Sequence, residues 1–130
     1  MKLTPQLAEA VVRTLVFSGG TEKILITGSI AIGATKDIAP ADIDFVCYRA
    51  DFERILHSWD ESPYFVSQGY KKVIDSITFN AIVATTEGEF QSWEIATKAL
   101  YNPDKEWASK RHRISAFSPI LEAAKGVLCS

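Results

Sequence analysis

The sequence predicts a single domain of the α/β (α+β) class, with a small mixed β-sheet flanked by helices and a helical C-terminal tail. Three observations predict this fold class. The chain has 130 residues, which suits one hydrophobic core. Short apolar runs at residues 23–27, 42–48 and 77–84 are typical of buried strands. Stretches with apolar residues at helical spacing precede and follow these runs.

The N-terminal helix is expected within residues 1–20. Thr4 is a typical N-cap and Pro5 a typical first helical residue, and the Gly19-Gly20 pair ends the helix. We expect residues 23–84 to form the sheet core. In that core Gly28 ends the first strand, and one or two helical turns follow it.

The rest of the core alternates between strands and turns. A helix is expected over residues 51–59, and a turn at Asp75-Ser76 precedes the clear strand 77–84. Residues 86–126 are expected to be helical. Asn102-Pro103 should separate a helix at 87–100 from a second helix at 103–117, because proline favours the first turn of a helix.

Composition indicates a soluble globular protein. The chain is 47% hydrophobic and 23% charged, and its net charge of −2 argues against a general nucleic-acid coat protein. No apolar run approaches the roughly 20 residues of a membrane helix, so no membrane association is expected. The N-terminal stretch lacks the pattern of a secretion signal, and two cysteines do not make a disulfide framework. We therefore expect a cytoplasmic protein.

Two aspartates stand out at the start of the strand 42–48. Side chains alternate along a strand, so Asp42 and Asp44 project from one face while Ile43 and Phe45 face a core. Two carboxylates on one face repel each other when they are shielded from water, unless they share a cation. Taken alone, the pair also fits a solvated acidic turn after Pro40. Hard cations such as Mg²⁺ prefer oxygen ligands of this kind.

Upstream, Gly28 and Ser29 follow the buried strand 23–27. Backbone N–H groups at such a turn suit a phosphate, because glycine carries no side chain and Ser29 adds a hydroxyl donor. A phosphate cradle beside metal ligands is the arrangement that nucleotidyl transfer needs. This spacing favours a metal or phosphate site over the acidic turn.

The pattern Gly28-Ser29, a spacer of twelve residues and then Asp42-Ile43-Asp44-Phe45 resembles the signature of the polymerase-beta type nucleotidyltransferase superfamily. Residues 76–117, "SITFNAIVATTEGEFQSWEIATKALYNPDKEWASKRHRISAF", resemble the C-terminal half of small nucleotidyltransferase-like proteins of phages and prophages. Together the two likenesses cover residues 23 to 125.

The resemblance implies a nucleotidyltransferase-type sheet, an NTP substrate and two Mg²⁺ ions, with Mn²⁺ as a substitute. Asp42 and Asp44 would bind the metal, and Gly28 and Ser29 would hold the triphosphate. The superfamily's third acid corresponds by register to Asn80, which can ligate a metal weakly but cannot accept a proton as a general base. Asp75 could replace it only if its loop folds back. Asn80 can also be interpreted as an ordinary cross-strand polar residue.

Two basic residues near the C-terminus are further candidates. Helical spacing places Lys110 and Arg113 on one side of the expected helix 103–117, where they would contact a triphosphate or an RNA end, although such residues usually form a solvated face.

Two functions follow from these residues. One is a minimal Mg²⁺-dependent nucleotidyltransferase that moves NMP from an NTP to an acceptor, with an RNA or a protein as the macromolecular alternatives. The other is a non-catalytic nucleotide-binding or regulatory protein, for example a phage modulator or an antitoxin-type partner. The missing third acid favours the second function. A plain structural α/β protein with an acidic turn is a third interpretation.

Overall fold

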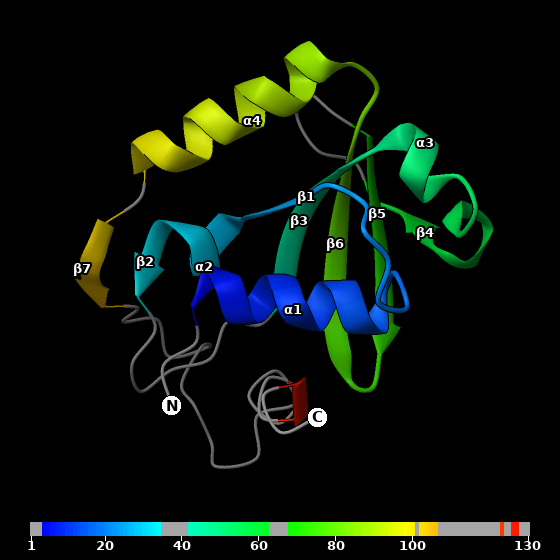
Figure 1. Ribbon diagram of the computed structural model, residues 1–130, viewed down its shortest axis with the longest axis horizontal. Coiled ribbons are helices and arrows are strands. Elements are labelled where there is room, and N and C mark those ends of the chain that lie inside the picture. The colour runs from blue at the N-terminus through cyan, green and yellow to red at the C-terminus, as the bar shows by residue number, and fades with distance from the viewer. Residues whose placement is uncertain are drawn as a thin grey trace.

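A five-stranded mixed sheet forms the centre of the protein in the computed structural model (Figure 1). The structure describes residues 4–34, 42–62, 68–100, 102–106, 123 and 126–127. The strands follow the order β1-β3-β6-β5-β4, and their bounds are Ile24–Thr27 (β1), Asp42–Tyr48 (β3), Ile77–Ala84 (β6), Gln68–Ile74 (β5) and Asp60–Glu61 (β4). Among the described strands of this sheet, β3 and β6 run parallel and the other neighbours are antiparallel.

Helices and a smaller sheet complete the described part of the chain. The helices are α1 (Pro5–Leu15), α2 (Gly28–Ile32), α3 (Arg49–Phe52), the 3-10 helix η1 (Leu56–Ser58) and α4 (Glu87–Leu100). Strands β2 (Gly33–Ala34) and β7 (Asn102–Glu106) pair in parallel as a separate two-stranded sheet. The predicted combination of a mixed sheet with flanking helices is therefore confirmed.

Helix α1 covers one face of the main sheet and lies across β3 and β6 in Figure 1. The Thr4 side chain caps the helix as predicted, since its Oγ1 accepts a hydrogen bond of 3.2 Å from the backbone N–H of Leu7. Val11 and Val12 of the helix are fully buried in the same cluster as the alternating strand residues Ile43, Phe45, Phe79 and Ala81. This apolar layer fixes the orientation of β3 and β6.

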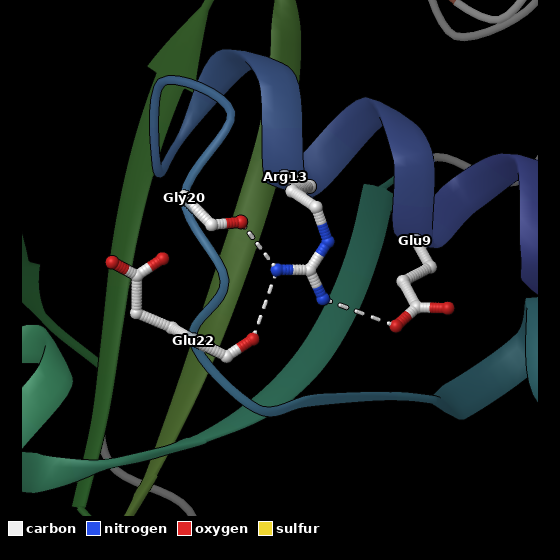
Figure 2. A network of polar contacts seen from close by, with 4 residues as sticks. All are labelled: Glu9, Arg13, Gly20 and Glu22. Atoms are coloured by element: carbon white, nitrogen blue, oxygen red, sulfur yellow. Dashed lines mark hydrogen bonds and ion pairs between the residues drawn. The ribbon is translucent and has the colours of Figure 1, made fainter.

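Arg13 ties the end of α1 to the segment that leads into β1 (Figure 2). Its Nη1 donates to the carbonyl oxygens of Gly20 at 2.6 Å and Glu22 at 2.9 Å, and its Nη2 donates to Glu9 Oε1 at 3.3 Å. The Glu22 carboxylate in turn pairs with Arg54 at 2.8 Å, between α3 and η1. These contacts fix where β1 begins, and β1 places Gly28 beside β3.

Helix α4 covers part of the opposite face. Phe90 packs with Val46 and Ile82, and its ring stacks on Tyr48 with 4.7 Å between ring centroids. Further along the helix, the hydroxyl groups of Thr97 and Thr27 are 2.8 Å apart in a buried hydrogen bond. The helix therefore follows the β1 side of the sheet and ends beside the last residue of β1.

The structure corrects two expected helices. Residues 103–106 belong to strand β7 and do not begin a helix, because this segment pairs with β2, a long-range contact that a local pattern cannot predict. The helix expected at 51–59 is split into α3 and η1, because the chain becomes extended at Trp59 and enters β4 at Asp60. Residues 107–122, which hold most of the second expected C-terminal helix, lie outside the described residues.

Candidate functional site

Asp42 and Asp44 project from the face of β3 opposite the α1 core. Both side chains are half-buried, whereas Ile43 and Phe45 between and after them are fully buried on the other face. The predicted alternation along this strand is confirmed. Asp44 lies in register with Thr27 on β1 and with Asn80 on β6, so these three side chains share one face of the sheet.

Asn80 joins the two aspartates. Its side-chain Nδ2 donates to Asp42 Oδ2 at 2.5 Å and to Asp44 Oδ1 at 2.8 Å, and the residue is only 7% exposed. Of the two interpretations of Asn80, the structure supports the one that faces the aspartates. The amide N–H groups supply the partial positive charge that holds the two carboxylates together.

Burial and the charge of Asp42 raise the pKa of Asp44 to about 6 from its ordinary value of 3.8, and the hydrogen bond from Asn80 opposes that rise. Burial is the largest of these causes, because few water molecules remain to solvate the ionised carboxylate. Near neutral pH the site therefore holds a negative charge that a positive partner would stabilise.

Gly28, which directly follows β1 and begins α2, touches the same carboxylate. Its φ of +69° lies in the left-handed region, and a Cβ atom at this position would lie 2.1 Å from Asp44 Oδ2. Glycine is thus required here both by the backbone conformation and by the position of Asp44. Gly28 was predicted as a phosphate-binding residue, and the structure adds this direct reason for its presence.

The remaining predicted residues are distributed differently. Ser29 is half-buried in α2, a helix of five residues, so its phosphate-binding role stays a prediction. Asp75 is exposed in the turn between β5 and β6 and has no hydrogen bond or ion pair among the described residues. It therefore does not complete the site. Lys110 and Arg113 lie outside the described residues.

Sequence reasoning missed Lys71, which lies in register with Asn80 on β5. The signal was available, because Asp75 and Ser76 form a two-residue turn with φ of 51° and 68°. That turn pairs Ile74 with Ile77. Counting three residues away from the turn on each strand, backward from Ile74 and forward from Ile77, pairs Lys71 with Asn80. A cross-strand partner thus follows once the turn length is known.

Two converging carboxylates and an amide fit one hard divalent cation. Asp42 Oδ2 and Asp44 Oδ1 both lie within 2.8 Å of one atom, Asn80 Nδ2, so both oxygens face a common point. A cation held by Asp42 and Asp44 would take the place of the Asn80 N–H groups between the two carboxylates. With the amide turned so that its oxygen faces the cation, Asn80 would be a weaker third ligand, and positions would remain for phosphate oxygens or water. No cluster of three or more His, Cys, Asp or Glu residues suited to a metal occurs among the described residues. Two carboxylates with one amide are thus the donor set that the described residues provide here.

The chain matches no protein-family model, and no curated protein matches it. In the described part of the chain, no helix is long and apolar enough to cross a membrane.

Proposed function

We propose that the protein binds an NTP together with a divalent cation at Asp42 and Asp44, as a nucleotidyltransferase-like binding protein. One observation carries the proposal: Asn80 holds the two half-buried carboxylates on a common point on the sheet face that α1 leaves free. Two carboxylates fixed in this way repel each other and destabilise the folded protein unless a positive partner lies between them. A cation that carries phosphate groups is such a partner.

Each residue of the site would have a different role in binding. Asp42 and Asp44 would hold the cation, and Gly28 allows the Asp44 carboxylate to lie against the backbone where β1 ends. Asn80 orients both carboxylates through its amide group. When bound, the cation supplies positive charge for phosphate oxygens. Because Asn80 cannot accept a proton, binding without turnover is the function that this donor set favours.

Nucleotidyl transfer is a second candidate function, favoured by the open surface beside the site. Asp42 lies in register with Thr78, and Thr78 with Val73, whose side chain is 59% exposed. An acceptor hydroxyl could approach the nucleotide from this side. The acceptor in this reaction would be an RNA or a protein. If the protein only binds the nucleotide, its role would instead be to regulate a partner protein, as a phage modulator does.

Thermal unfolding with ligand tests the binding proposal. We expect ATP, GTP, CTP or UTP to raise the melting temperature in the presence of Mg²⁺ or Mn²⁺, and to raise it much less with EDTA, since ligand binding to the folded state stabilises it. Asp42→Asn and Asp44→Asn should remove the shift. Failure of all four NTPs to shift the wild-type protein with either metal would overturn the proposal.

Labelled NTPs separate the two candidates. Incubation with Mg²⁺ and a total RNA and protein extract should leave no label on a macromolecule if the protein only binds. Label that is transferred by the wild type and lost in both aspartate variants would establish the enzyme instead.

A further inference from the structure

One row of polar side chains crosses all five strands of the main sheet on the face that holds the two aspartates. Residues in register on neighbouring strands share a face, so successive pairings connect the members of the row. In strand order the row consists of Thr27, Asp44, Asn80, Lys71 and Asp60.

The neighbouring row on the opposite face has a different character. Ile26, Phe45, Ala81 and Tyr70 are in register there and are 6%, 0%, 0% and 6% exposed. The strands therefore carry apolar side chains on the face that packs against α1. On its own face, the polar row lies next to an apolar patch formed by Val46 and Ile82, which Phe90 of α4 covers. The side chains on this face therefore become polar beyond the patch that Phe90 covers.

Lys71 is the basic member of this row. Its side chain is exposed and forms no ion pair within the described part of the chain, including with its register partner Asp60. Neighbouring strands are about 4.8 Å apart, which places Lys71 roughly 10 Å from Asp44 across the sheet. Lys72, by contrast, is turned to the other face, where its Nζ donates to Ser58 Oγ at 3.0 Å.

A ligand with several negative groups needs positive charge beyond that of a cation at the two aspartates. A divalent cation at Asp42 and Asp44 would only balance those two carboxylates, whereas a polyphosphate brings further negative charge. Within the described residues Lys71 is the nearest cation in register with the site on this face. A lysine ammonium on a flexible stem suits a phosphate that lies beside the metal.

We propose that Lys71 is a positioning residue that binds a phosphate group of the nucleotide held at Asp42 and Asp44. The phosphate chain then lies across β6 from the cation toward β5. This inference rests on the proposed function and assigns the direction of the ligand on the sheet.

The test compares Lys71→Gln with Lys72→Gln, which removes an equal charge from the adjacent position on the other face. Binding of Mn²⁺ alone, of inorganic triphosphate with Mg²⁺ and of the four NTPs with Mg²⁺ is measured by calorimetry. We expect Lys71→Gln to weaken triphosphate and NTP binding at least tenfold and to leave Mn²⁺ binding within twofold. Lys72→Gln should change each affinity less than threefold.

The outcomes separate the two proposals. If the wild type binds an NTP with Mg²⁺ and Lys71→Gln binds it equally well, the assignment of Lys71 is overturned and the proposed function stands. If both variants weaken NTP and triphosphate binding equally, Lys71 acts only through the net charge of the protein. That result would also overturn the assignment. If the wild type binds neither NTP nor triphosphate with Mg²⁺, both proposals fail.

Discussion

The Asp44 carboxylate lies directly against Gly28, so closely that a Cβ atom on Gly28 would be 2.1 Å from Asp44 Oδ2. The contact joins the end of β1 to the start of β3. It makes the glycine and the aspartate parts of one site, although fifteen residues separate them in the sequence.

Gly28→Ala should destabilise the protein by about 2–4 kcal/mol, because the new methyl group meets Asp44 and the backbone has a positive φ. Gly19→Ala is the matched control. Gly19 has a φ of +81° but no atom within 4 Å of its Cβ position, so it reports backbone strain alone, about 1–2 kcal/mol. Urea unfolding measures both, and equal losses would contradict the Asp44 contact.

Asn80→Ala should destabilise the metal-free protein by roughly 2–4 kcal/mol, since two carboxylates lose a shared donor. Asn80→Asp should also destabilise it, because a third carboxylate adds repulsion in a buried position. Saturating Mg²⁺ should recover much of that loss in Asn80→Asp and little in Asn80→Ala. Chemical unfolding with and without Mg²⁺ measures this difference, and an equal response of both variants would speak against a cation at this point.

The raised pKa of Asp44 predicts a pH-dependent contribution to stability. The folded state binds this proton more tightly than the unfolded state, so the contribution is complete below pH 3.8 and is lost as the pH rises through about 6. Asp44→Asn should therefore be more stable than the wild type at pH 8, by up to about 3 kcal/mol, and nearly equal at pH 3.5. Urea unfolding between these pH values measures the difference, with the exposed Asp60→Asn as control. A difference that does not vary with pH would contradict the assignment.

The Thr27–Thr97 hydrogen bond should hold the second half of α4 against the sheet. Thr97→Val leaves the buried Thr27 hydroxyl without a partner and should cost about 1–3 kcal/mol. The double variant Thr27→Val/Thr97→Val removes both hydroxyls. Its loss in free energy of unfolding should be smaller than the sum of the losses of the two single variants. Additive losses in unfolding experiments would show that the two hydroxyls act independently.

The strands around the site could be predicted from sequence because their signals are local. Short apolar runs predicted β3 at 42–48 and β6 at 77–84, and both bounds agree with the structure. The Asp75-Ser76 turn was likewise predicted. Asn80 kept two interpretations, because a strand pattern does not say which strand lies beside it.

The parts that could not be predicted depend on long-range contacts. The contact between Gly28 and Asp44 requires the pairing of β1 with β3. Strand β7 forms against β2 despite Pro103, which locally favours the start of a helix. The position of Lys71 was accessible in principle, but only by combining the turn at Asp75 with the strand pattern on both sides.

Binding of Mn²⁺ followed by electron paramagnetic resonance, with and without an NTP, tests the central claim most directly. The signal of free Mn²⁺ should fall when wild-type protein is added. With an NTP present, the spectrum should change further on adding the protein, relative to the same Mn²⁺–NTP mixture without protein. Asp42→Asn and Asp44→Asn should abolish the uptake, while Asp60→Asn, at the far end of the polar row, should retain it. If wild-type protein takes up no Mn²⁺ even with NTP, or if Asp44→Asn takes up as much as the wild type, the aspartate pair is not a cation site.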